Sequence, residues 1–200
     1  MRAQKTESEL RQQQIVEAAL ELIGSEGINA LSIAGIAARV GIVPSALYRH
    51  FKGKDEVLDA VLELLQCRLA DSVSLVREET KGALPRLQSL LMRHARMLSE
   101  NRAIPHVVFS DGLYTGRPER KAKVGGIILG FLKKIEQILE EGQQEGAIRD
   151  DVVPATAAVM FLGMILPAAV LRNVTEGRFD MIANAERAWP VFVKCIATEG

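Results

Sequence analysis

Apolar residues recur every three or four positions along most of the chain, which is the spacing of one face of an α-helix. The first clear run consists of Ile15, Ala18, Ala19, Leu22 and Ile23. Runs that alternate apolar and polar residues, which are typical of strands, are few. The pattern therefore predicts an all-α fold of about nine helices.

Two short segments follow the first helix. Ser32 is placed to cap a helix of about two turns that ends at Gly41. Pro44 suits the first turn of a further helix, predicted to run to about Phe51, because a proline there loses no hydrogen bond. Two short helices joined by a tight turn with a glycine are typical of the helix-turn-helix motif.

The second of these short helices has two different faces. Leu47 and Phe51 lie four residues apart and share a face that we expect to be buried. Ser45, Tyr48 and Arg49 share another face, about 100° away, that we expect to be exposed. In a helix-turn-helix, this second helix lies in the major groove of DNA.

Longer helices are predicted beyond residue 54, and they are separated by glycine, proline or turn-forming residues. Their approximate ranges are 55–80, 87–98, 107–113, 118–142, 154–173 and 181–198. The sequence thus predicts two domains, an N-terminal three-helix helix-turn-helix domain at 1–54 and a C-terminal helical domain at 55–200.

Charge is balanced over the whole chain, with 25 basic and 25 acidic residues, but not locally. Residues 32–54 contain Arg39, Arg49, Lys52 and Lys54 and no acid. A basic patch beside an exposed Tyr and His fits contact with phosphate, although a charge run is also common on an ordinary solvated face.

Composition is that of a soluble globular protein, with 48% hydrophobic and 25% charged residues. Cys67 and Cys195 lie far apart without metal-ligand spacing, which indicates neither a disulfide framework nor a zinc site. His94 and His106 do not share a helix-face spacing, so no metal site and no cofactor are predicted. The polar N-terminus lacks the apolar core of a secretory signal, and a cytoplasmic location is expected.

One apolar stretch allows a different interpretation. Residues 152–171 contain no charge and are long enough to span a bilayer. Against a membrane span stand Pro154 and Pro167, the many alanines, and the lack of flanking Trp or Tyr. A helix that is apolar all round can equally be buried between helices or between subunits.

The segments LSIAGIAARV (31–40) and GIVPSALYRHFKGKDEVLDAV (41–61) carry a more specific signal. With the preceding SEGINALSI, they resemble the DNA-binding half of a tetracycline-repressor (TetR) family transcriptional regulator. The detailed resemblance covers about the first 60 residues. Beyond them, only the number, length and order of the helices resemble the ligand-binding and dimerisation domain of that family.

The resemblance implies roles for residues that match the family's motif. Pro44, Ser45, Ala46 and Arg49 take the positions of the recognition helix that read bases, with Arg49 suited to guanine. The remaining matches, which contact the DNA backbone or base edges, are Ser32, Tyr48, His50 and Lys54. Each also has a simpler interpretation as an exposed or packed residue without a DNA contact.

Two positions depart from the family pattern. Val43 stands where a Ser, Thr or Asn cap is usual, so the predicted recognition helix lacks a side-chain cap. Gly35 stands where an acid would complete a capping box with Ser32.

Dimers are expected because one helix-turn-helix seldom reads enough DNA alone, and a palindromic operator would match a two-fold axis. The best candidates for the dimer interface are the uncharged helix predicted at 154–173 and the last helix, at 181–198. Burial in a dimer would explain the uncharged stretch without a membrane. The expected interface residues are Met160, Gly163, Met164, Pro167, Leu171, Trp189 and Phe192.

The resemblance implies that the middle helices enclose a binding site for a small-molecule effector. A mostly apolar lining would favour a largely apolar effector. The candidate lining residues, each of which can equally be plain core, are Cys67, His94, Met97, His106, Phe109, Phe131 and Met164.

These expectations add up to a DNA-binding repressor that a small effector releases from its operator. The competing interpretation is an all-α enzyme or small-molecule carrier whose basic patch is incidental. The sequence shows no nucleophile–base set with a recognisable spacing, no glycine-rich phosphate loop and no paired carboxylates to support it.

Overall fold

A computed structural model describes residues 6–101, 103–108 and 117–198 of the chain. The described residues are helical almost throughout, which confirms the all-α prediction. Their β-type pairing is limited to one isolated antiparallel bridge between Ile148 and Ala197.

The chain forms two compact units, and each is made of two segments. The first unit comprises Met1–Cys67 and Asn101–Val124, and the second comprises Arg68–Glu100 and Gly125–Gly200. Helices α4 (Lys54–Glu79) and α8 (Pro118–Gln144) each contribute residues to both units. The functional division predicted at residue 54 stays a prediction about which residues bind DNA and which bind an effector.

The first unit begins with α1 (Glu7–Glu26), whose first turn is closed by a capping box between Thr6 and Glu9. Gly27 ends α1 with a φ of +83°, a conformation that favours glycine. The unit also contains the first parts of α4 and α8. Its remaining elements are η1 (Ile28–Ala30), α2 (Ile33–Val40), α3 (Pro44–Leu47) and α6 (Ala103–Val108).

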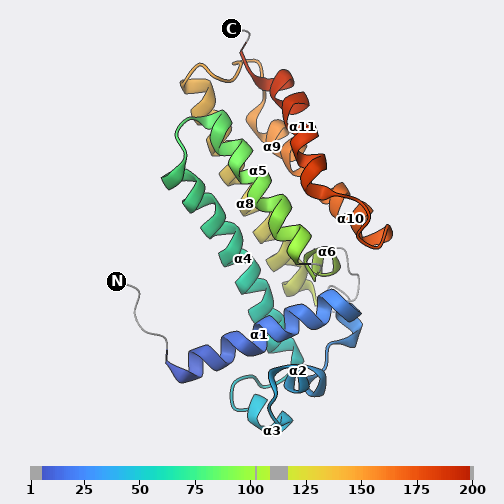
Figure 1. Ribbon diagram of the computed structural model, residues 1–200. Coiled ribbons are helices and arrows are strands. Elements are labelled where there is room, and N and C mark those ends of the chain that lie inside the picture. Colours follow the sequence, from blue (N-terminus) through green and yellow to red (C-terminus); the bar gives the residue numbers. More distant parts are fainter. Residues whose placement is uncertain (1–5, 102, 109–116, 199–200) are drawn as a thin grey trace. The chain divides into compact units, whose positions relative to one another are not determined.

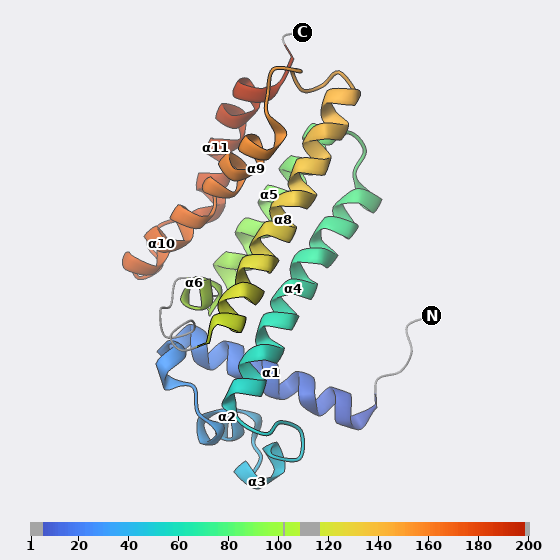
Figure 2. The same ribbon diagram turned by 180° about the vertical axis from the view of Figure 1, so that it is seen from behind.

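Helix α1 is the helix on which several other elements of the first unit pack. It buries one apolar face, including Ile15, Ala19 and Ile23, which are fully inaccessible to solvent. α2, η1 and α6 contact α1, and Figures 1 and 2 both show α2 beside α1 and α3 next to α2. Gly24 allows α6 to approach α1 closely, because a Cβ on Gly24 would lie 3.0 Å from the backbone nitrogen of Ala103.

The second unit is a helical bundle. Its helices, besides the later parts of α4 and α8, are α5 (Ala83–Glu100), α9 (Pro154–Gly163), α10 (Leu166–Val174) and α11 (Met181–Ile196). α5 packs on α11, and α10 contacts both α9 and α11 (Figure 2). The core is apolar and includes Leu87, Leu90, Leu91, Ile135, Ile138, Leu139 and Phe161.

The helix predicted at 154–173 is divided in the structure. α9 ends at Gly163 and α10 begins at Leu166. Pro167 explains the break, because a proline cannot donate a hydrogen bond to the carbonyl of Gly163 and its ring would collide with that carbonyl. Met164 and Ile165 instead form tight turns through bonds to residues three positions earlier.

Helix α6 starts earlier than the segment predicted at 107–113, and residues 109–113 of that segment lie outside the described residues. The closing helix, predicted to reach Thr198, ends at Ile196 and accommodates Pro190 in its interior.

Candidate nucleic-acid interface and effector site

The turn between α2 and α3 is built by local hydrogen bonds. The Ser32 hydroxyl accepts a hydrogen bond of 3.1 Å from the Gly35 backbone N–H, so Ser32 caps α2 as predicted. At the other end, Gly41 has a left-handed conformation (φ 75°, ψ 33°), which glycine adopts without strain. The Ile42 N–H then donates to the Ala37 carbonyl over 3.0 Å and directs the chain into α3.

Helix α3 is shorter than the prediction to about Phe51. It begins at Pro44 behind Val43, which makes no side-chain cap, and it ends at Leu47. Arg49 and His50 donate to carbonyls three residues earlier, so the chain tightens into successive turns. The segment after the helix is therefore a compact extension of α3.

The two faces of this segment are as different as the pattern predicted. Leu47 is fully buried and Phe51 is 7% exposed, so both anchor the segment to the unit. On the opposite side, Tyr48 is 57% exposed. Of the other predicted DNA-binding residues, Ala46 and His50 are half-buried, and the exposed ones are Ser32, Pro44, Ser45, Arg49 and Lys54.

The positive patch is smaller than its sequence suggests. The Arg39 guanidinium donates to the Ser25 hydroxyl (2.8 Å) and forms an ion pair with Glu26 (2.9 Å), so its charge is matched at the end of α1. The structure describes no such pair for Arg49, Lys52 or Lys54 among the residues it covers. These three bases therefore form the exposed positive surface.

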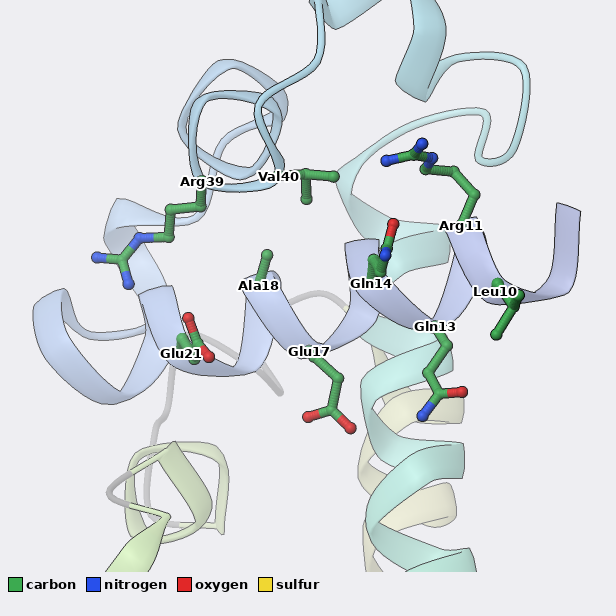
Figure 3. A pocket seen from close by; sticks show the side chains of 9 residues that line it. All are labelled: Leu10, Arg11, Gln13, Gln14, Glu17, Ala18, Glu21, Arg39 and Val40. Atoms are coloured by element: carbon green, nitrogen blue, oxygen red, sulfur yellow. The ribbon is translucent and has the colours of Figure 1, made fainter. Parts of the chain in front are cut away.

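A surface groove of about 500 Å³ runs between α1 and the end of α2. Figure 3 shows Gln14 and Ala18 under Val40, whereas Gln13 and Glu17 point to the other side of α1. The lining carries two bases and two acids, so the groove favours neither anions nor cations. Its full lining is Leu10, Arg11, Gln13, Gln14, Glu17, Ala18, Glu21, Arg39 and Val40.

In the second unit, α5 and α8 bring together His94 and Phe131, two of the predicted effector-site residues. Their rings are stacked, with centroids 5.0 Å apart and planes inclined by 18°. His94 is only 6% exposed, and this burial lowers its pKa from 6.5 to about 4, so the imidazole is neutral. Its Nδ1 has no hydrogen-bond partner among the described residues.

The other predicted effector-site residues are dispersed. Met97 and Met164 are half-buried in the second unit, and Cys67 is exposed in the first. His106 lies on α6, and Phe109 lies outside the described residues. Their place in an effector site stays a prediction. Within the described chain, no group of three His, Cys, Asp or Glu side chains could hold a metal ion.

Two family models match this chain. The model of bacterial regulatory proteins of the tetR family matches residues 15–61, which include the whole α2–α3 motif and Lys54. The model of the C-terminal region of YsiA-like proteins matches residues 65–195. The chain belongs to the TetR family. The regulator class predicted from the sequence is thereby confirmed.

Individual relatives match over nearly the full length at low identity. The nucleoid occlusion factor SlmA of Yersinia enterocolitica is 23% identical over 92% of this chain and 93% of its own. FadR, a fatty acid degradation regulator from Bacillus halodurans, has a TM-score of 0.79 at 20% identity, covering 95% of this chain and 96% of its own. SmeT in complex with triclosan has a TM-score of 0.79 at 21% identity, covering 96% and 93%. These likenesses establish the TetR fold over both units.

The last helices of this TetR-family chain expose an apolar surface, which we call the α9–α11 surface. Met160 is 49% exposed and Leu171 is 44% exposed, and Gly163 and Pro167 are exposed beside them. Met164 is half-buried. Further apolar residues that are at least 40% exposed on these helices are Val159, Val170, Val174 and Val191.

Trp189 and Phe192 are buried within the protomer rather than exposed. Their ring centroids lie 6.0 Å apart, and Phe192 also contacts Phe161 edge to face. Their direct contribution to a dimer interface stays a prediction.

One helical run among the described residues, Pro154–Val174, is long and apolar enough to cross a membrane by length and composition. Its mean hydropathy is 2.0, and 39% of it is buried in the protomer. The break between α9 and α10 divides this run into segments of ten and nine residues. A membrane-spanning helix needs about 20 residues, so neither segment alone has that length.

Proposed function

We propose that this chain is a homodimeric, cytoplasmic repressor that binds a palindromic operator and is released by a small, largely apolar effector. The exposed face of α3 and its extension carries the proposal. That face presents Tyr48 and Arg49, and Leu47 and Phe51 hold its reverse side in the core. Lys54 follows at the start of α4, with no acid between it and Arg49. Such a helix can enter the major groove without disturbing its own packing.

Within this surface the side chains have separate tasks. Arg49 can donate two hydrogen bonds to guanine and thereby select sequence. Lys54 stands at the first residue of α4, where unpaired backbone N–H groups also favour a phosphate. Further contacts to the DNA backbone or to base edges come from Ser32, Tyr48 and His50. Lys54 therefore contributes to affinity for any duplex, and Arg49 contributes to the choice among duplexes.

The first experiment measures binding to a duplex taken from the region upstream of the chain's own gene. We expect Arg49→Ala to cost roughly 1–3 kcal/mol and to reduce discrimination against unrelated DNA. We expect Lys54→Ala to weaken binding to all duplexes similarly and to reduce the salt slope by about one per subunit.

Matched controls for these variants are Arg96→Ala and Lys134→Ala, which remove exposed bases from α5 and α8 in the second unit. Both should bind DNA like the unaltered protein. Absence of binding to the upstream duplex at low salt, by a folded protein, would contradict the DNA-binding assignment of these residues.

The effector half of the proposal is supported by the second unit. Its core is apolar, and the stacked His94–Phe131 pair adds a single neutral polar group. A site of this kind suits a mostly apolar molecule with one hydrogen-bonding group. TetR-fold proteins have been solved with stearoyl-CoA, in FadR of Bacillus subtilis, and with triclosan, in SmeT.

Triclosan, which is mostly apolar and has one hydroxyl group, is therefore the first probe for this chain. Stearoyl-CoA tests whether an apolar chain with a charged headgroup is also accepted. We expect triclosan to release the upstream duplex and to raise the thermal unfolding midpoint. His94→Leu should weaken that response because it removes the polar group. If only a strongly charged molecule without apolar groups released the protein from the duplex, the prediction of an apolar effector would be wrong.

A further inference from the structure

A cluster of ion pairs joins the beginning of α4 to the beginning of α8 inside the first unit. Asp55, Asp59 and Glu63 follow one another at four-residue spacing on one face of α4. Arg117, Arg120 and Lys123 follow one another at three-residue spacing at the start of α8. We call this arrangement the α4–α8 ladder.

Each base of the ladder contacts an acid opposite it. Arg117 pairs with Asp55 at 2.6 Å, and Lys123 pairs with Glu63 at 2.9 Å. Arg120 lies between them and contacts both Asp55 (3.3 Å) and Asp59 (3.1 Å). The first three turns of α4 are thus held along one side by α8.

Arg120 differs from the other members because its guanidinium is only 6% exposed, whereas its partners Asp55 and Asp59 are 44% and 47% exposed. It also donates to the backbone carbonyl of Asp55 over 3.3 Å. An ion pair with one buried member and a half-exposed partner contributes little to the stability of a fold. What it adds is a fixed geometry, since the planar guanidinium bonds in a defined plane.

The residue fixed in this way is the immediate neighbour of a proposed DNA contact. Lys54 is the first residue of α4, and Asp55 is the second. Because Arg120 holds both the side chain and the carbonyl of Asp55, it restricts the backbone from which the Lys54 side chain extends. The described residues give the Lys54 amine no fixed partner of its own.

We propose that Arg120 is a positioning residue for DNA binding: it fixes the first turn of α4 on α8 and thereby sets the Lys54 phosphate contact. This inference rests on the proposed function of Lys54.

The decisive experiment is a double-mutant cycle between Arg120→Gln and Lys54→Ala, measured as affinity for the upstream duplex at fixed salt. We expect Arg120→Gln to weaken binding about fivefold to tenfold, similar to Lys54→Ala. If Arg120 acts through Lys54, the double variant should bind like either single variant. Arg120→Lys should restore part of the affinity because it keeps the charge.

Arg86→Gln is the matched control. Arg86 is 20% exposed, pairs with Glu141 at 3.1 Å and donates to the Thr80 carbonyl, and all three residues lie in the second unit. Its replacement should lower the thermal unfolding midpoint without changing the affinity for DNA. A general loss of folding would lower both quantities for both variants.

If Arg120→Gln does not fold, Asp59→Asn carries the test, because it removes the charge of one partner and leaves both Asp55 contacts. Its smaller loss of affinity should also vanish on the Lys54→Ala background. Additive losses, or a folded Arg120→Gln that binds like the unaltered protein, would overturn the inference while the proposed function stands. A protein that fails to bind the duplex before any substitution contradicts the proposed function itself.

Discussion

Gly35 lies close to two side chains. A Cβ at this position would lie 3.1 Å from both the Leu22 side chain and the Ser32 hydroxyl. Both distances are shorter than ordinary van der Waals contact, so a larger residue would require these side chains to shift by a few tenths of an ångström. Glycine also leaves the capping box incomplete, and the Ser32 cap alone starts α2.

His94 makes the second unit sensitive to acid. Its pKa is about 4 in the fold against an ordinary value of 6.5, so between these values the unfolded chain binds a proton that the folded chain does not. The free energy of unfolding should therefore fall as the pH falls through this window, by at most about 1.4 kcal/mol per pH unit. Urea titrations at pH 7, 6, 5 and 4 measure it.

The comparison that isolates this effect is His94→Leu, which has no titrating group at the same buried position. The difference in stability between the two proteins should change with pH only below about 6.5. A difference that stays constant from pH 7 to pH 4 would show that the imidazole is not buried as described.

At the scale of helices, α8 holds two glycines with opposite surroundings, Gly126 in its interior and Gly142 in its last turn. A Cβ on Gly126 would meet nothing within 4 Å, whereas a Cβ on Gly142 would lie 2.5 Å from the Ile148 side chain and 2.8 Å from that of Ala83. We expect Gly126→Ala to stabilise the protein by roughly 0.5–1 kcal/mol, because alanine favours a helix over glycine. We expect Gly142→Ala to destabilise it by about 1–3 kcal/mol through overpacking.

Chemical unfolding of the two single variants measures both effects in the same helix. Helix propensity can only favour alanine over glycine at both positions, so a destabilised Gly142→Ala protein shows the effect of packing. Equal changes in the two variants would contradict the close packing of Gly142 against Ile148 and Ala83.

The helices themselves were largely predictable, because each begins or ends at a residue whose chemistry is local. Pro44, Pro118 and Pro154 mark helix starts, and Gly27 and Gly41 mark helix ends, as the sequence indicated. The division of residues 154–173 was also contained in Pro167, since a proline inside an apolar run breaks the hydrogen bonding four residues earlier. The uninterrupted hydrophobicity of this stretch gave no sign of the break between α9 and α10.

Contacts between distant segments were not predictable in the same way. Arg120 and Asp59 lie 61 residues apart in the chain, and neither is unusual in its own helix. The acidic spacing on α4 and the basic spacing on α8 were visible in the sequence, but they could equally mark solvated faces. Only the packing of α8 beside α4 makes these six residues partners.

At the scale of the whole molecule, the α9–α11 surface should decide assembly. Leu171 lies on this surface and is 44% exposed, and Leu129 on α8 is 67% exposed outside it. In a dimer built on the α9–α11 surface, Leu171→Glu would bury an unpaired charge in each subunit, which costs roughly 3 kcal/mol or more. The dissociation constant should rise by more than about 100-fold.

Leu129→Glu is the matched control and should leave the dimer intact. Sedimentation velocity over a range of concentrations distinguishes the two variants, and the monomeric variant should also bind the upstream duplex more weakly. A Leu171→Glu protein that sediments as a dimer would place the interface elsewhere. Recovery of the unaltered protein in carbonate-washed membranes would favour a bilayer as the partner of this surface.

The chain has a single tryptophan, Trp189, and it packs against Phe192 in the second unit. Its ultraviolet emission is consequently a built-in reporter on α11, with no dye and no engineered label. Because the proposed DNA-binding residues all lie in the first unit, a change in this emission on adding DNA would report that DNA binding alters the second unit.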